Sequence, residues 1–161
     1  MVQEWQGKEV IFPDTINWSI PGTDSITQLP ETGYKILNYI DSAGCMECRA
    51  HFYEWHLMKQ QTDSLDLDVV YLVVANMADY RALETLQRTN RWCVSTFQDK
   101  AMVMDSLNHF PKQDGLQSFL LDSLNRVVLI GNPVRSHAVR DLYIESIQQG
   151  VTGEMKDMEN N

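Results

Sequence analysis

The alternation of apolar and polar positions predicts an α/β chain from residue 34 onward. Residues 34–40 and 68–74 are short, mostly apolar runs with β-branched side chains, which is typical of buried strands. Between them, four residues recur near helical spacing and predict a helix with one apolar face: Cys48, Phe52, Trp55 and Met58. A strand, a helix and a second strand in this order favour an α/β domain.

The middle of the chain continues this alternation. Residues 80–86 carry apolar positions at helical spacing, and Asn76 or Asp79 would cap the helix that they predict. Residues 92–97 have an extended pattern, and residues 101–107 predict a short helix. The alternation of helix and strand therefore persists through this part of the chain.

The last third of the chain has the clearest pattern. Two apolar runs, 117–122 and 126–131, flank the polar turn 123–125, and this arrangement predicts an antiparallel hairpin. A closing helix follows over residues 139–147, with Ser136 as its predicted N-cap. Parallel strands followed by a hairpin predict a central mixed sheet flanked by helices.

The two ends of the chain differ from this core. Residues 1–30 contain short apolar stretches broken by proline and glycine, so we expect an N-terminal β extension of one or two short strands. Residues 151–161 are polar and lack periodicity, so we expect a flexible tail. A length of 161 residues fits one domain, which we place at residues 1–150.

Charge and composition exclude several classes of protein. A formal net charge of −9 with no run of Lys or Arg argues against a general binder of nucleic acid. No stretch approaches the ~20 apolar residues of a membrane span, and the first residues show no secretory signal. A membrane tether or a removed signal would therefore lie outside this sequence.

The three cysteines are the strongest candidates for chemistry. Cys45 and Cys48 are separated by two residues and follow the strand at 34–40, in the first turn of the predicted helix, whereas Cys93 stands alone in an apolar segment. At a helix N-terminus, backbone N–H groups and the helix dipole stabilise a thiolate. We therefore expect Cys45 to be the attacking thiol and Cys48 the shielded resolving thiol, with Cys93 buried and inert.

These residues resemble the thioredoxin-like superfamily. The resemblance rests on the order of elements, the segment Gly44-Cys45-Met46-Glu47-Cys48 and the hairpin 118–128 followed by Gly131, and it covers roughly residues 8–149. Within the superfamily, the chain is most similar to the TlpA/ResA-type extracytoplasmic thiol–disulfide reductases. The resemblance implies a thioredoxin fold and exchange with a disulfide-containing protein through a mixed disulfide.

The resemblance also implies a setting for this chemistry. It places the protein outside the cytoplasm, in the periplasm or cell envelope. The dithiol would need no cofactor, because an upstream electron-donor protein would reduce it again.

The chain departs from the superfamily at several positions. Gly44 precedes the first cysteine where the family usually has tryptophan or proline, and Tyr39 replaces the buried acid of thioredoxin proper. The family's cis-proline slot falls at Leu116 or Gln117, because Pro111 lies too far upstream. We expect Leu116 and Gln117 to line an altered substrate groove.

The residues around the cysteines would modulate the pair. Gly44, Met46 and Glu47 are the immediate neighbours of Cys45. The negative charge of Glu47 opposes a thiolate at Cys45, so we expect a less acidic thiol and a reductant rather than an oxidase.

Three other interpretations of the cysteine pair remain open. A structural disulfide would need no exchange, and a binding module would keep the fold without activity. Cys45, Cys48 and His51 would together suit zinc or copper(I), although we favour His51 as a solvent-facing helix residue and predict no metal.

Overall fold

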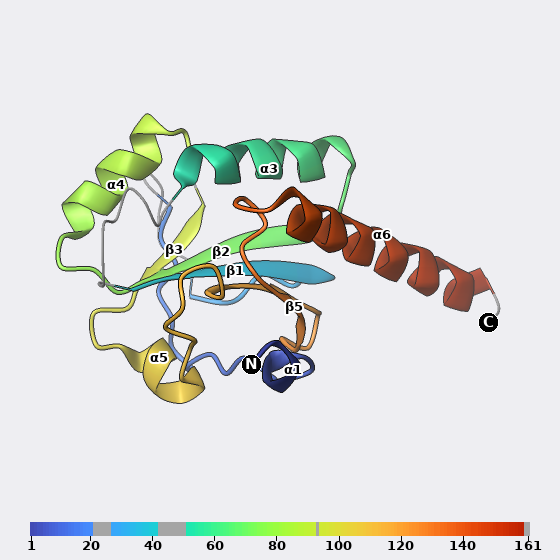
Figure 1. The fold of residues 1–161 in the computed structure, drawn as a ribbon, viewed down its shortest axis with the longest axis horizontal. Helices are drawn as coiled ribbons and strands as arrows, with labels where there is room; N and C mark the ends of the chain where they lie inside the picture. The colour runs from blue at the N-terminus through green and yellow to red at the C-terminus, as the bar shows by residue number, and fades with distance from the viewer. Residues whose placement is uncertain (21–26, 42–50, 93, 160–161) are drawn as a thin grey trace.

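A five-stranded mixed sheet forms the centre of the molecule (Figure 1). The computed structural model describes residues 1–20, 27–41, 51–92 and 94–159, with side chains as far as Gly150. The strands lie in the order β3-β2-β1-β4-β5, so β1 is central. The strands are β1 (Tyr34–Ile40), β2 (Val69–Ala75), β3 (Ser95–Gln98), β4 (Ser118–Leu121) and β5 (Val127–Ile130).

The sheet combines a parallel and an antiparallel half. β1 pairs with β2, and β2 with β3, in parallel. β4 runs antiparallel to β1, and β5 antiparallel to β4, so the hairpin completes the sheet on the other side of β1. This arrangement confirms the mixed sheet that the sequence predicts.

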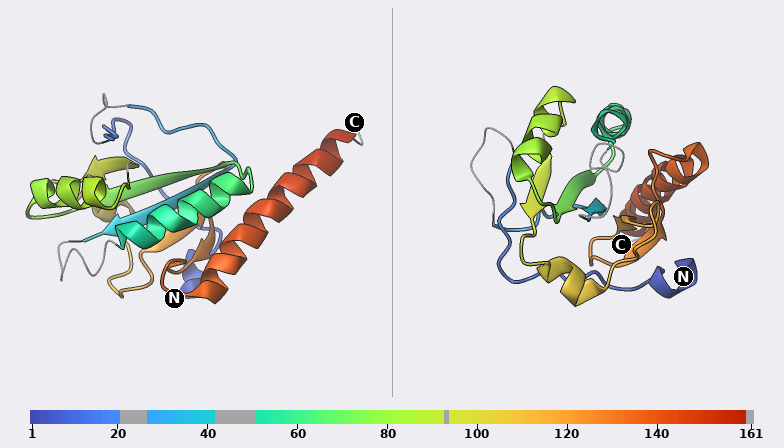
Figure 2. Two further views of the ribbon diagram at one scale, coloured as in Figure 1. Left: turned by 90° about the horizontal axis from the view of Figure 1, so that it is seen from above. Right: turned by 60° about the vertical axis from the view of Figure 1, so that its left-hand side comes forward.

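Helices cover both faces of the sheet, as the views of Figure 2 show. α3, α4 and α6 lie on one face, and α1 and α5 lie on the other together with the N-terminal segment. The helices are α1 (Val2–Trp5), α3 (Phe52–Ser64), α4 (Tyr80–Thr89), α5 (Val103–Asn108) and α6 (His137–Glu159).

Side chains alternate along β1 between two hydrophobic cores, one on each face of the sheet. Ile36 and Ile40 pack with α3 and α6, whereas Leu37 and Tyr39 pack on the opposite face with Phe110 and the N-terminal segment. Successive side chains of a strand point to opposite faces, so a strand that is buried on both sides is apolar throughout. This explains why residues 34–40 are mostly apolar, with Lys35 and Asn38 as the exceptions.

The N-terminal segment makes fewer strand contacts than predicted. The described residues before β1 form the short helix α1 and two isolated bridges, Glu9 with Arg126 and Ser19 with Thr96, in place of regular strands. The segment is held by buried anchors such as Trp5 and Trp18. Side-chain burial, rather than a backbone ladder, therefore fixes its course.

The closing helix is longer than predicted. α6 continues to Glu159, so most of the segment 151–161 that was expected to be a flexible tail is helical. Within this helix, Gly150 lies against the hydroxyl of Tyr34, and a Cβ atom at this position would clash with it. The absence of a side chain at Gly150 permits this close packing.

Within the described part of the chain, none of the helices combines the length and apolar character that a membrane crossing requires.

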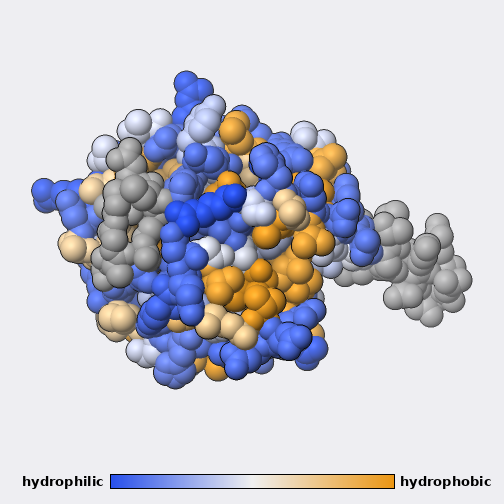
Figure 3. Space-filling view, viewed as in Figure 1, coloured by the Kyte–Doolittle hydropathy of each residue, from blue (hydrophilic) through white to orange (hydrophobic). Residues whose placement is uncertain are grey.

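The edge strand β5 carries apolar surface. Val128, Leu129 and Ile130 are only half-buried. In the face shown in Figure 3, apolar residues gather near the centre, over the region where Figure 1 shows β5 and its neighbouring segments. Residues 7–9 cover the start of this edge, since Gly7 and Lys8 exchange backbone hydrogen bonds with Val127 at 2.7 and 2.9 Å.

Candidate functional site at the carboxyl end of the central strand

The carboxyl end of β1 is where the sequence predicts the reactive pair. β1 ends at Ile40 and α3 begins at Phe52, so the connection between them runs from the end of the central strand to a helix start. The five predicted residues of this connection lie outside the described residues and stay predictions. They are Gly44, Cys45, Met46, Glu47 and Cys48.

The helix that follows the cysteine segment is anchored as expected. Phe52, Trp55 and Met58 are all buried, with exposed fractions of 3% or less, and they pack against the sheet. The apolar face predicted for residues 52–58 is therefore confirmed. An anchored helix with a fixed N-terminus is the local frame in which a thiol at that terminus would sit.

The position of the expected cis-proline is occupied by Gln117. The described peptide bonds are all trans, including the one between Leu116 and Gln117. Gln117 is 6% exposed, and its carbonyl oxygen accepts a hydrogen bond of 2.8 Å from the backbone N–H of Tyr39. Gln117 therefore lies beside the end of β1, while Leu116 is half-buried in the preceding turn. That the two residues line a substrate groove stays a prediction.

The side chain of Gln117 ties three segments together. Its Nε2 donates to the carboxylate of Asp41 at 2.7 Å and to the carbonyl of Pro111 at 3.0 Å. Asp41 is the last described residue before the cysteine segment, and Pro111 belongs to the loop after α5. The amide of Gln117 thus holds Asp41, the residue after β1, next to the loop after α5. Only the tertiary structure shows this role.

Tyr39 stands where thioredoxin proper has a buried acid, and it supplies no such acid. The ring is 2% exposed and stacks on Phe110 with centroids 4.6 Å apart. Burial raises the pKa of the Tyr39 hydroxyl, and the carboxylates of Asp105 and Asp41 raise it further. The hydroxyl therefore stays protonated in the neutral range and carries no negative charge.

Asp99 is a buried carboxylate at the same end of the sheet that the sequence analysis missed. It is 1% exposed, and its two oxygens accept from the N–H groups of Val103 at 2.7 Å and Met104 at 2.9 Å. Both N–H groups belong to the first turn of α5, which otherwise lacks a side-chain cap. An acidic residue shortly before a predicted helix was the available signal.

His51 is a turn residue rather than a helix residue. It precedes α3 with φ 44° and ψ 41°, a left-handed conformation that histidine adopts more often than most residues. Nε2 accepts a hydrogen bond of 3.2 Å from Nε of Arg135, and the guanidinium of Arg135 is ion-paired with Asp114. His51 was expected to be a solvent-facing helix residue; it stands instead at the N-cap of α3 and is half-buried, because Arg135 reaches it from a distant segment.

No metal site emerges among the residues that the structure describes. Within them, no group of three His, Cys, Asp or Glu side chains is arranged to hold a metal ion. Cys45 and Cys48 lie outside this search, as does Cys93, whose neighbours Trp92 and Val94 are buried.

Solved structures of low sequence identity share this architecture. The thioredoxin domain of a thiol–disulfide oxidoreductase from Bacteroides vulgatus superposes with a TM-score of 0.60 at 13% identity, over 86% of this chain and 97% of that one. The chain has a thioredoxin-like fold. This confirms the fold class and the resemblance seen in the sequence, although no protein-family model and no curated protein matches the chain.

Two further thioredoxin-like structures show the breadth of this likeness. One is a secreted disulfide oxidoreductase of Mycobacterium tuberculosis, described as homologous to E. coli DsbE, with a TM-score of 0.55 at 12% identity over 74% of this chain and 84% of that one. The other is peroxiredoxin Q of Xanthomonas campestris, with a TM-score of 0.58 at 12% identity over 84% of this chain and 91% of that one. At such identities the likeness establishes the fold.

Proposed function

We propose that this protein is a thiol–disulfide oxidoreductase that reduces disulfides in partner proteins through Cys45 and Cys48. The proposal rests on one observation: both cysteines belong to the connection between the carboxyl end of β1 and the start of α3 in a thioredoxin-like fold. Two of the structures that share the fold are described as disulfide oxidoreductases. The periplasm or cell envelope would be the setting, in line with the secreted enzyme among them.

The exchange proceeds in two thiolate attacks. The thiolate of Cys45 attacks one sulfur of the substrate disulfide, and the other substrate sulfur leaves as a thiolate that takes up a proton. The thiolate of Cys48 then attacks the sulfur of Cys45, which forms the Cys45–Cys48 disulfide and releases the substrate as a dithiol. Two electrons have passed to the substrate, and a reduced dithiol protein supplies two electrons to restore the pair.

The charges around the pair favour a reductant. Glu47 opposes a thiolate at Cys45, and a less stabilised thiolate makes the dithiol a better electron donor. We therefore propose net reduction of substrates by this protein.

Replacement of Cys45 tests the mechanism. Cys45→Ser should lower the rate of insulin disulfide reduction by at least about 100-fold, since no other group replaces a nucleophilic thiolate. Cys93→Ser is the matched control and should keep the activity. Equal activity of Cys45→Ser and the unmodified protein would refute the mechanism.

A second candidate function is a binding module without exchange activity. Gln117 favours it, because the slot of the expected proline holds a side chain whose amide is already bonded to Asp41 and Pro111. Titration of the free thiols in the presence of reduced glutathione distinguishes the two functions. A Cys45–Cys48 disulfide that resists reduced glutathione, with no turnover of insulin, would favour the binding module.

A further inference from the structure

The opposite end of β1 holds a buried lysine. Lys35 is the second residue of the strand and is 4% exposed. In the register of the sheet it stands between Val70 of β2 and Leu121 of β4. A lysine is seldom buried to this extent unless its ammonium group has partners.

The ammonium group of Lys35 has few partners. It carries three N–H donors, but its only hydrogen bond among the described residues is a long one, 3.4 Å to the carbonyl of Ser123. Burial lowers its pKa below the ordinary value, and the nearby carboxylates of Asp122 and Asp68 offset part of this effect. Within the described chain, neither carboxylate forms an ion pair with Lys35.

Both neighbouring carboxylates accept hydrogen bonds from donors other than Lys35, Asp122 through Oδ1 and Asp68 through both oxygens. Asp122 accepts from the backbone N–H groups of Leu124 and Arg126, each at 2.9 Å. Asp68 accepts from the hydroxyl of Thr32 and from the N–H of Gly33, each at 2.7 Å. These bonds hold the two carboxylates in place near Lys35 without satisfying it.

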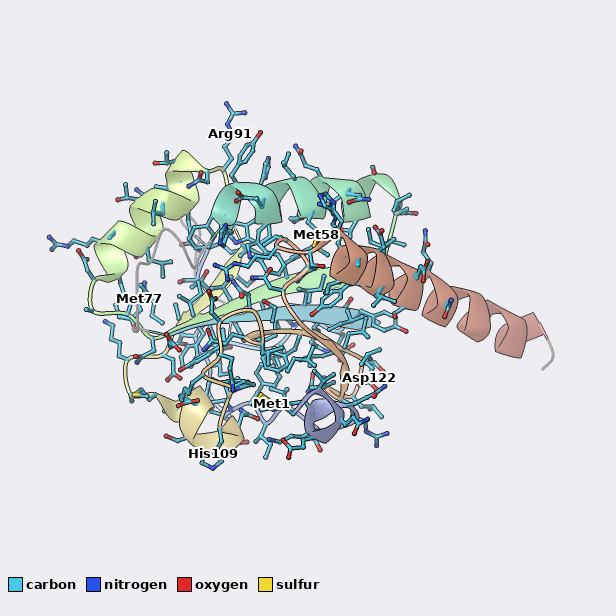
Figure 4. All side chains as sticks on the ribbon, viewed as in Figure 1. Met1, Met58, Met77, Arg91, His109 and Asp122 are labelled. Atoms are coloured by element: carbon cyan, nitrogen blue, oxygen red, sulfur yellow. The ribbon has the colours of Figure 1, made fainter. Side chains whose placement is uncertain are left out.

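A surface hollow of about 310 Å³ opens at Lys35. Its size is at the lower end of the range for small-molecule pockets, roughly 300–1,000 Å³. Besides Lys35, it is lined by residues of the segment before β1 and of the β4–β5 turn: Leu29, Glu31, Thr32, Ser123 and Asn125. Figure 4 shows Asp122, which precedes this turn, at the end of the sheet opposite to Met77, which follows β2.

Asn125 is the second polar group in the hollow without a full set of partners. Its Oδ1 is buried and accepts no hydrogen bond from the described residues. Its backbone is held firmly, because its N–H donates to Asp122 at 3.0 Å and its carbonyl accepts from Val10 at 2.8 Å. Two residues that line the hollow thus have unused hydrogen-bonding capacity within the described chain: N–H donors at Lys35 and the buried Oδ1 of Asn125.

We propose that this hollow binds a small zwitterion, such as a free α-amino acid. Its carboxylate would accept hydrogen bonds from Lys35, and its ammonium group would donate to Oδ1 of Asn125 on the side where Glu31 lies. A zwitterion suits the charges here, because Asp68, Asp122 and Glu31 repel a dianion such as phosphate. The site lies at the far end of β1 from the cysteines, so it does not depend on the proposed redox function.

Titration of the full-length protein with L-alanine tests the site. Saturable shifts are expected in the backbone amide signals of residues 29–35 and 123–126. Acetate and ethylammonium each carry one half of the zwitterion and should bind at least about tenfold more weakly, since each lacks one charged hydrogen-bonding group. Absence of saturable shifts up to about 10 mM, or equal binding of acetate, would refute the proposal. Tighter binding of inorganic phosphate would also refute it.

Two variants locate the binding. Lys35→Met keeps a long side chain and should weaken alanine binding at least about tenfold, whereas Lys59→Met on α3 should leave it unchanged. If Lys35→Met does not fold, Asn125→Gly decides, because Asn125 has φ 61° and glycine tolerates that conformation. Asn125→Gly should also weaken binding, and unchanged affinity in either folded variant would overturn the proposal.

Discussion

Three buried polar side chains at the two ends of the central strand differ in how fully they are bonded. At the carboxyl end, Gln117 bonds to Asp41 and Pro111, and Asp99 uses both oxygens to hold the start of α5. At the amino end, Lys35 makes a single long hydrogen bond among the described residues.

This difference separates two roles for polar residues in a core. A polar group whose partners all come from the chain fixes backbone segments relative to one another, and its removal leaves the partners unsatisfied. A polar group with unused donors lowers stability and remains available to a ligand. The carboxyl end is thus a rigid frame for the cysteine segment, whereas the amino end is suited to binding.

Loss of the Asp99 carboxylate should lower the free energy of unfolding more than substitution of Gln117 or Lys35. Asp99→Ala removes the acceptor of two N–H groups at the start of α5, so we expect a loss of about 2–4 kcal/mol in the free energy of unfolding. Urea denaturation followed by circular dichroism measures it. Asp79→Ala is the matched control, because Asp79 caps α4 at an exposed position and should cost only about 1 kcal/mol. An equal loss in both variants would mean that burial adds nothing at the carboxyl end.

A charge at position 117 should have an intermediate effect. Gln117→Glu has nearly the same shape but sets a carboxylate against Asp41 in place of a donor, so we expect a loss of about 1–2 kcal/mol at pH 7. The repulsion raises the pKa of the new carboxyl group in the folded state, so stability should return as the pH falls below about 4.

The control for this variant lies in the same loop. Gln113→Glu adds the same charge at an exposed position and should change stability little at either pH. Chemical denaturation at pH 7 and at pH 4 compares the two. A pH-independent loss in Gln117→Glu would show that the amide does not act through Asp41.

The smallest effect is expected at Lys35, and it has the opposite sign. Lys35→Met removes an under-bonded buried charge, so we expect the melting temperature at pH 7 to rise by about 2–4 °C. Burial lowers the pKa of Lys35 in the folded state, so the folded state binds fewer protons than the unfolded state. The gain should therefore shrink as the pH rises toward the ordinary lysine pKa of 10.5.

Differential scanning calorimetry at several pH values checks this prediction. Lys59→Met is the reference, because Lys59 pairs with Asp63 on the surface of α3, and exposed pairs contribute little. A fall in the melting temperature of Lys35→Met would show that attraction to Asp122 and Asp68 outweighs desolvation. The contrast between the two ends of β1 would then fail.

Local patterns predicted most of the elements. The strand at residues 34–40 matches β1, and the predicted hairpin matches β4 and β5 with Asn125 in its turn. Asp79 caps α4 as one of the two expected residues, and the hydroxyl of Ser136 accepts from the N–H of Val139 at the start of α6. These features follow from interactions within a few residues, which is why the sequence alone reveals them.

The chain ends and the site required more than local patterns. The N-terminal strands became isolated bridges because Trp5 and Trp18 are held by distant residues, Phe119 and Phe97 among them. At Gly150, α6 lies so close to the hydroxyl of Tyr34 that a Cβ atom would not fit. In both cases a contact between remote segments shapes the chain, and no local pattern shows it.

The sequence by itself determined the fold class, the central strand and the segment in which Cys45 and Cys48 lie. Apolar periodicity encodes which side of each element is buried, and that is sufficient to define the layers of an α/β domain. Only the tertiary structure decided that Gln117 meets Asp41, 76 residues away in sequence, and that Lys35 is buried with unused donors. Partners of this kind depend on the register between strands and the path of distant loops, which no local pattern specifies.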